Sequence, residues 1–186
     1  MLSPRRPTGG EALRHATIYP VDIPVTAATA AAADDLAELA AATFPFACPP
    51  SATAEDIADH VAANLSARRF ADYLADPARR VFTATEGGRM VGYTMLVHQR
   101  DPVPTVEVSK MYVLPSHHGS GVAAALMRAG LDWAATTSAP TAWLGVNQAN
   151  LRAQRFYRRH GFAITGTRTF RLGNGVESDF VMTRPL

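Results

Sequence analysis

The sequence contains a single cysteine, Cys48, among its 186 residues. A lone cysteine excludes a disulfide framework and a cysteine-based metal cluster, and it favours a reducing compartment. Long apolar runs are also missing, since no stretch approaches the roughly 20 apolar residues that a membrane span requires. The first ten residues, MLSPRRPTGG, include arginines with no apolar run behind them, so they do not resemble a secretory signal. We therefore expect a cytoplasmic protein that does not bind a membrane.

Charged residues are also few, at 18% of the chain, against 47% hydrophobic residues. This composition is typical of a folded globular domain. The formal net charge of +2 is too small to indicate nucleic-acid binding. The charges are unevenly distributed, because residues 1–110 hold ten Lys or Arg and thirteen Asp or Glu, whereas residues 111–186 hold eight Arg and three acidic residues. The C-terminal part is therefore the basic part of the molecule.

The length suits one domain with a continuous core. We expect a flexible N-terminal tail over residues 1–14 and a single domain over residues 15–186. The first element predicted in the domain is a strand, ATIYPVDI (16–23), which is typical of a sheet edge because it contains a proline.

Helical spacing dominates the next part of the chain. Residues 26–44 predict one helix, whose apolar face holds Leu36, Leu39 and Ala40. A second helix is expected after Thr53, with Asp56 three residues later as a weaker form of the capping box. A third is expected after Ser66.

The periodicity then changes to that of strands. RVFTAT and MVGYTMLVH flank EGGR (86–89), which predicts a β-hairpin. TVEVSKMYVL (105–114) predicts the next strand. The elements expected beyond it are a helix from residue 122, a strand over 141–146, a helix over 149–160 that Gly161 ends, and strands over 162–170 and 177–183.

A glycine-containing loop joins strand 105–114 to the following helix, in PSHHGSGVAAALM (115–127). Unpaired N–H groups and the helix dipole favour an anion at such a junction, and Gly119 and Gly121 remove side chains that would keep a phosphate away. A Walker P-loop needs a Lys-Ser or Lys-Thr after its last glycine, and none is present. GSGVAA does match a dinucleotide-binding pattern, but the next strand ends in Val-Asn-Gln (146–148) instead of an acidic residue.

A third interpretation accounts for more of the chain. MYVLPSHHGSGVAAALM resembles the acyl-CoA loop of the GNAT acetyltransferases, which has Gln or Arg, Gly, and Gly or Ala where this chain has His118, Gly121 and Ala123. WLGVNQANLRAQRFYRRHGF is similar to the next strand and helix of that family. The stretch from LSARRF to VGY and the ending FRLGNGVESDFVMTRPL resemble its PaiA type, the polyamine acetyltransferases. The resemblance covers residues 16–186. It implies an α+β fold with a mixed, mostly antiparallel sheet of about seven strands flanked by helices.

The resemblance also implies a site for acetyl-CoA as co-substrate. It implies that strand 105–114 diverges from strand 141–147 and offers its amides to the acyl and pantetheine arm, while the loop amides take the pyrophosphate. Tyr157 can then protonate the sulfur, and Glu107 is the candidate base, acting directly or through water. Each also has a plainer interpretation, Tyr157 as a half-buried aromatic with a solvated hydroxyl and Glu107 as a solvated strand residue or hairpin partner. The cofactor-binding residues implied are Met111, Tyr112, Val113, His118, Gly119, Ser120, Gly121, Val122, Ala123, Asn150 and Tyr157.

Some of these residues have a second interpretation. Asn150 is also a suitable helix N-cap, and it lies two helical turns from Tyr157, so both should face the same way. His118 contributes either its side chain or only its backbone N–H. His117 and His118 do not predict a metal site, because no third ligand is near them in sequence. One arginine among residues 152–159 could meet the adenosine phosphate.

The charge distribution favours a cationic acceptor. The basic part would hold the cofactor, and the part that shapes the acceptor pocket contains Glu55, Asp56, Asp59, Asp72 and Asp76. The same five residues also fit exposed helix charges, which is the commoner role of such residues. We therefore expect direct acetyl transfer to a primary amine of a small molecule, with a polyamine as the first hypothesis, by a monomer or homodimer without metal or nucleic acid. The alternatives are an acyl-CoA sensor that does not turn over, acetylation of protein N-termini, and an oxidoreductase that binds a dinucleotide.

Overall fold

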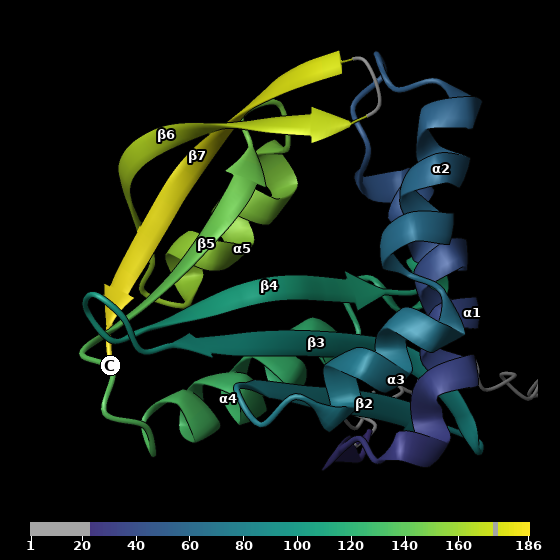
Figure 1. The fold of residues 1–186 in the computed structure, drawn as a ribbon, viewed down its shortest axis with the longest axis horizontal. Helices are drawn as coiled ribbons and strands as arrows, with labels where there is room; N and C mark the ends of the chain where they lie inside the picture. Colours follow the sequence, from purple (N-terminus) through teal and green to yellow (C-terminus); the bar gives the residue numbers. More distant parts are fainter. Residues whose placement is uncertain (1–22, 173–174) are drawn as a thin grey trace, which may run out of the picture.

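The computed structural model describes residues 23–172 and 175–186. The predicted tail over 1–14 lies outside the described residues, and so does the predicted strand over 16–23 except for Ile23. Across the described residues, one mixed sheet is flanked by helices on both faces (Figure 1).

The sheet has seven strands in the order β1-β2-β3-β4-β5-β7-β6. Every neighbouring pair is antiparallel except β4 and β5, which are parallel. This confirms the expected mixed, mostly antiparallel sheet. The strands are β1 (Val25–Ala27), β2 (Arg79–Glu86), β3 (Arg89–Gln99), β4 (Thr105–Val113), β5 (Thr141–Asn147), β6 (Ala163–Leu172) and β7 (Gly175–Pro185).

The helices begin and end close to the residues that the sequence indicates. Thr53 forms a capping box with Asp56 at the start of α2, as predicted. Ser66 precedes α3, although its side chain makes no capping hydrogen bond. The helices are η1 (Ala30–Ala32), α1 (Ala33–Thr43), η2 (Phe44–Ala47), α2 (Ala54–Asn64), α3 (Ala67–Ala75), η3 (Pro115–His117), α4 (Val122–Ala134) and α5 (Leu151–Arg159).

The predicted helix over residues 26–44 begins later than expected. Val25–Ala27 form the edge strand β1 on β2, and Thr29 is extended before η1 and α1. Val25 and Thr26 are β-branched and favour a strand, and their pairing with β2 keeps this segment out of the helix that the following alanines favour. The predicted apolar face of α1 is confirmed, because Leu36, Leu39 and Ala40 are all buried.

The predicted β-hairpin is also confirmed. Glu86 pairs with Arg89, and Gly87 and Gly88 form the two-residue turn with φ angles of 56° and 78°. Both angles are in the left-handed region that a type I′ turn requires and that glycine adopts without strain.

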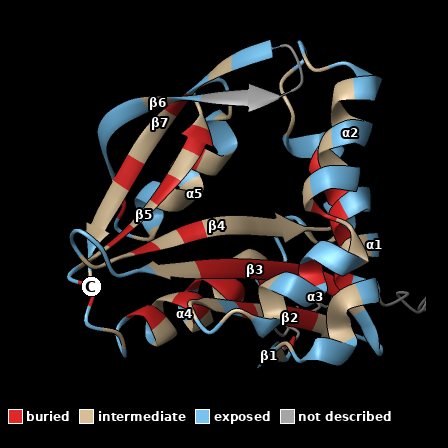
Figure 2. Ribbon diagram, viewed as in Figure 1, coloured by how far each residue is buried: buried red, intermediate tan, exposed pale blue. Residues whose placement is uncertain are grey.

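Two layers of helices enclose the sheet. α4 packs on β2, β3 and β4, and α5 places Phe156 and Tyr157 against the same core cluster as α4. α1 and α3 pack on the other face, around a second cluster that includes Phe70 and Tyr93. β3 lies between the two layers, and Figure 2 shows it buried along most of its length.

Candidate active site

β4 and β5 are neighbours in the sheet but separate along their length. Their pairing is confined to two positions of β4, Val106 and Glu107, and Figure 1 shows the strands diverging beyond them. β4 stays paired with β3 as far as Val113. The expected divergence of strand 105–114 from strand 141–147 is therefore confirmed, and it opens a gap within the sheet.

The backbone N–H groups of Met111 and Val113 point into this gap. The N–H of Leu114 donates to a β3 carbonyl at 2.9 Å, and successive N–H groups of a strand alternate in direction. Tyr112 therefore directs its N–H toward β3, while Met111 and Val113 direct theirs toward the open side. The carbonyl of Val113 also lies on the open side, where the ring of His118 donates to it at 3.1 Å.

The loop between β4 and α4 adopts the backbone that its glycines predict. Gly119 and Gly121 have φ angles of 85° and 95°, in the left-handed region. Gly121 is the residue immediately before α4, so the N-terminus of that helix faces the loop. No atom of the described residues lies within 4 Å of where a Cβ at either glycine would be. The loop therefore leaves its backbone open to a ligand.

Some amides of this loop are already engaged. The N–H groups of His118 and Ser120 donate to carbonyls within the loop, at 3.1 and 3.3 Å. In the described part of the chain, no backbone acceptor is bonded to the remaining amides, which are those of Gly119, Gly121, Val122 and Ala123. The set of amides suited to a pyrophosphate is thus narrower than the sequence predicts, because two of the six close the turn instead.

The side chain of His118 lies between β4 and α5. Its Nδ1 is 2.7 Å from Nη1 of Arg152, and its Nε2 is 3.1 Å from the carbonyl of Val113. Arginine can only donate and a carbonyl can only accept. These contacts therefore fit the neutral ring with its proton on Nε2. A protonated ring has no acceptor for Arg152, so the arrangement favours a positioning contact over a direct charge on phosphate.

A cleft of about 440 Å³ adjoins the loop and the gap. Strand residues Met111 and Val113 line it together with the two loop glycines, and α5 adds Tyr157 and the cations Arg152 and Arg159. Open amides at a helix N-terminus with two arginines nearby suit a polyphosphate. The residues present therefore fit the expected acetyl-CoA.

Tyr157 lies where this cleft meets a second cavity, and it lines both. Its ring packs edge-on against Phe156 at 5.4 Å between centroids. Burial raises the pKa of its hydroxyl to about 12. Tyr157 therefore keeps its proton at any ordinary pH and can donate it.

Asn150 is both a helix cap and a cavity residue. Its Oδ1 accepts from the N–H of Ala153 at 3.0 Å, which starts α5. It also lines the second cavity together with Tyr157. The expected common orientation of these two residues is confirmed.

The second cavity, of about 260 Å³, extends from Tyr157 toward the other face of the sheet. The connection between α1 and α2 forms one wall through Phe44 and Cys48, and β7 contributes Glu177 and Asp179. The five acidic residues expected to shape an acceptor pocket do not line it. They lie on or beside α2 and α3, where Asp72 and Asp76 pair with arginines.

Arg168 connects the carboxylates around this cavity. Its Nε is 3.3 Å from Asp179 and its Nη1 is 3.9 Å from Glu107. The guanidinium lies against the backbone of Gly145 on β5, and a Cβ at that position would overlap it. Glu107 is thus held beside the cavity by Arg168, whereas Asp179 forms part of its lining. Burial raises the pKa of both carboxyl groups.

Cys48 lies in the wall of the second cavity and donates to the carbonyl of Phe44 at 3.4 Å. Burial raises the pKa of its thiol to about 11. The thiol is therefore protonated at neutral pH and is a poor nucleophile. This supports transfer without an acyl-cysteine.

Four charged residues of this cavity were not predicted from the sequence as site residues: Lys110, Arg168, Glu177 and Asp179. Glu177 and Asp179 are two residues apart in a strand, so they share a face. That spacing in the sequence indicates that the two carboxylates lie together. The sequence gives no such signal for the register that pairs β7 with β5 and β6 with β7 in the sheet.

No group of three or more His, Cys, Asp or Glu side chains suited to a metal ion occurs within residues 23–172 and 175–186. In the same residues, no helix has the length and apolar character needed to cross a membrane.

Comparison of the sequence with known proteins finds a matching family and similar proteins. The model of the acetyltransferase (GNAT) family matches residues 33–162. An uncharacterized N-acetyltransferase of Mycobacterium tuberculosis is 57% identical over 154 residues, which cover 83% of this chain and 97% of that protein. The streptothricin acetyltransferase of Streptomyces lavendulae is 33% identical over 96 residues, which cover 49% of this chain and 48% of that enzyme.

Structural comparison agrees at the level of the fold. The PaiA N-acetyltransferase from Thermoplasma acidophilum, solved in complex with coenzyme A, superposes with a TM-score of 0.77 at 16% identity. The match covers 88% of this chain and 99% of that structure.

Proposed function

Since the chain belongs to the GNAT family and is an N-acetyltransferase, we propose that it transfers acetyl from acetyl-CoA directly to a primary amine of a small molecule. One observation carries this proposal. The cleft that fits acetyl-CoA and the cavity lined by carboxylates share a wall at Met111, Val113 and Tyr157. A thioester and an amine that enter from the two sides would meet there.

We assign the cofactor to the cleft. The amides of Gly119, Gly121, Val122 and Ala123 bind the pyrophosphate, with Arg152 and Arg159 nearby. His118 and Ser120 close the loop and keep these amides in place, and Tyr112 and Asn150 complete the wall beside Tyr157.

The N–H groups of Met111 and Val113 bind the acyl end and its arm. Acetyl-CoA supplies an acetyl group activated as a thioester. Donors that point at a developing negative charge on a carbonyl oxygen accelerate acyl transfer. Because no strand of the described part of the chain pairs with the open side of β4 at these residues, the two amides are available for this role.

Tyr157 is proposed as the acid that protonates the departing sulfur. It lies at the junction of the two cavities, and its raised pKa of about 12 keeps it protonated. General acid catalysis by a positioned group contributes roughly 10²–10⁴-fold.

The amine must lose a proton before it attacks. The proposed base is Glu107 acting through water, and Asp179 is a direct candidate because it lines the cavity. Burial raises the pKa of both groups, which makes each a stronger base than an exposed carboxylate. Arg168 contacts both, so it positions them whichever acts.

The acceptor is proposed to be a small cationic amine, with a polyamine as the first class to test. Glu177 and Asp179 in the cavity support a cation, and the likeness to the PaiA type points to polyamines. Acetylation of protein N-termini and a sensor without turnover are the alternatives. We further propose a cytoplasmic monomer or homodimer that needs neither metal nor nucleic acid.

The test is a turnover screen with acetyl-CoA over polyamines, amino acids, aminoglycosides and peptide N-termini, read by release of CoA thiol. We expect one class of small amine to stand out, and Cys48→Ala to retain the activity. Turnover of peptides alone would replace the small-molecule acceptor by a protein. Acetyl-CoA binding without turnover of any amine would establish a sensor.

A further inference from the structure

We propose that Lys110 is itself an acetyl acceptor, so that the enzyme acetylates this side chain in its second cavity when no amine substrate is bound. The proposal rests on the proposed acetyl-CoA site. It concerns a primary amine that is already inside the cavity and that no step of the proposed reaction uses.

The position of Lys110 carries the proposal. It lines the second cavity together with Tyr157, and it directly precedes Met111, whose N–H is assigned to the acyl end. It lies on the face of β4 opposite α4, because its partner on β3, Met95, belongs to the core cluster under α1 and α3. The acetyl group and this side chain would therefore be neighbours along one strand.

The surroundings of the ammonium compensate its charge only in part. Its Nζ lies 5.4 Å from the ring centroid of Tyr73, and the guanidinium groups of Arg69 and Arg79 lie 5.4 and 4.8 Å from the same centroid. Three cations therefore gather around one tyrosine. The ring is fixed in place, since its hydroxyl donates to the carbonyl of Asn64 at 3.2 Å.

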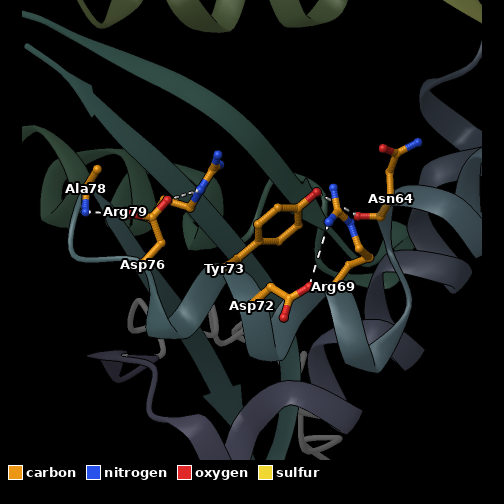
Figure 3. A network of polar contacts seen from close by, with 7 residues as sticks. All are labelled: Asn64, Arg69, Asp72, Tyr73, Asp76, Ala78 and Arg79. Carbon is orange, nitrogen blue, oxygen red and sulfur yellow. Dashed lines mark hydrogen bonds and ion pairs between the residues drawn. The ribbon is translucent and has the colours of Figure 1, made fainter.

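The carboxylates near this cluster form ion pairs with the arginines. Figure 3 shows Tyr73 between two ion pairs, Arg69 with Asp72 at 3.7 Å and Arg79 with Asp76 at 2.9 Å. Among the residues that the structure describes, no carboxylate lies within 4.0 Å of the Lys110 ammonium. The lysine thus shares the repulsion of the cluster without an ion pair of its own.

The consequence is a reactive amine. Burial, with further contributions from Arg79 and Arg69 that exceed the opposing effect of Glu107, lowers the pKa of Lys110 to about 8. At pH 7.5 such a group holds about 10²-fold more neutral amine than an exposed lysine with a pKa of about 10.4. Neutral amine is the form that attacks a carbonyl.

The step balances with the reactants already proposed. The ammonium releases one proton to solvent, and its nitrogen then attacks the acetyl carbon. A C–N bond forms, the C–S bond breaks and the electron pair leaves on sulfur. Sulfur takes a proton from Tyr157, which recovers one from the nitrogen. The products are Nε-acetyl-lysine, CoA thiol and one proton in solution.

The experiment is simple because Lys110 is the only lysine in the sequence. The purified protein is incubated with acetyl-CoA and no amine, and intact mass and peptide mapping follow the gain of one acetyl group. We expect one acetyl on Lys110, slowed by an amine acceptor, at a rate that rises with pH through about 8 and then levels. CoA protection against thermal unfolding is measured in parallel.

A matched control moves the lysine to the surface. The double variant Lys110→Arg, Arg80→Lys has one lysine, at an exposed position of β2 that makes no ion pair or side-chain hydrogen bond in the described structure. We expect its acetylation to be about 10²-fold slower at pH 7.5 and to keep rising toward pH 10.

Two results would overturn the proposal. One is an unmodified Lys110 in a protein that CoA protects and that turns over an amine, which would leave the proposed function intact. The other is equal acetylation of the surface lysine, which would indicate plain chemical reactivity. An absence of CoA protection would instead contradict the cofactor site, and with it the proposed function.

Discussion

Tyr157 lies where the cleft meets the second cavity, and removing its hydroxyl tests the proposed acid. We expect Tyr157→Phe to lower the rate constant of the chemical step on the order of 10²-fold, because one positioned proton donor is lost. CoA binding should be unchanged, since the ring still fills the same space. Single-turnover kinetics with thermal protection by CoA would measure both. An unchanged chemical rate would remove Tyr157 as the acid.

The same substitution at Tyr93, in the core, should change the stability of the protein and not its rate. Its hydroxyl is buried without a hydrogen-bond partner in the described structure, and its ring is fully buried. A buried polar group without a partner costs about 1–3 kcal/mol. Tyr93→Phe should therefore raise the free energy of unfolding by about 1 kcal/mol, measured by urea denaturation, and leave turnover unchanged. A loss of stability would show that the hydroxyl has a partner in solution.

At the scale of elements, the loop that leads into α4 carries the proposed pyrophosphate site. Gly121→Val places a β-branched side chain at a φ of 95°, which strains the backbone by about 1–2 kcal/mol, and beside the open amides. We expect the fold to survive and CoA affinity to fall at least about tenfold, measured by calorimetry. Gly166→Ala is the control, because a Cβ there meets no atom of residues 23–172 and 175–186 within 4 Å. Normal binding by Gly121→Val would mean that the phosphates lie elsewhere.

The contact of Arg168, on β6, with Gly145, on β5, tests the proposed acceptor side. Gly145→Ala should displace the guanidinium of Arg168 from the backbone of β5 and disturb its contacts with Asp179 and Glu107. Hydrogen bonds to charged groups contribute about 1.5–3 kcal/mol, so kcat/KM for the amine should fall roughly 10- to 100-fold. CoA protection should persist. If kcat/KM is unaffected, Arg168 does not position the base.

Helices, strands and turns could be predicted from the sequence wherever neighbouring residues alone determine the backbone conformation. A capping box at Thr53, two glycines in the hairpin and glycines before α4 each determine their own backbone. The start of α1 could not be predicted, because an alanine-rich stretch fits several conformations and the edge of β2 selects one.

At the scale of the whole molecule, ligand-induced stability separates the candidate functions. A ligand at about a hundredfold excess over its Kd adds about 2.7 kcal/mol, which corresponds to roughly 5–10 °C in Tm for a domain of this size. We expect acetyl-CoA to produce this shift and NAD or NADP to produce none. A shift with a dinucleotide alone would contradict the assignment of acetyl-CoA to the cleft.

The arrangement of the whole molecule also explains why the acceptor side of the proposed site could not be predicted from the sequence. The proposed cofactor side is built from one continuous stretch, β4 to α5, so the spacing of Gly121, Asn150 and Tyr157 indicates its geometry. The acceptor side joins the α1–α2 connection to β6 and β7, far apart in sequence. Glu177 is an example, because Ser51 donates to it at 2.6 Å across 126 positions of the chain.

The gap between β4 and β5 has one more consequence, for the exchange of amide hydrogens with solvent. Amides without an acceptor exchange quickly, and those in a sheet exchange slowly. Met111 and Val113 should therefore exchange far faster than Tyr112, which lies between them and donates to β3. A ligand that supplies carbonyl oxygens to the gap would slow the outer two and leave the central one unchanged. Three consecutive residues thus report occupancy of the gap against an internal standard.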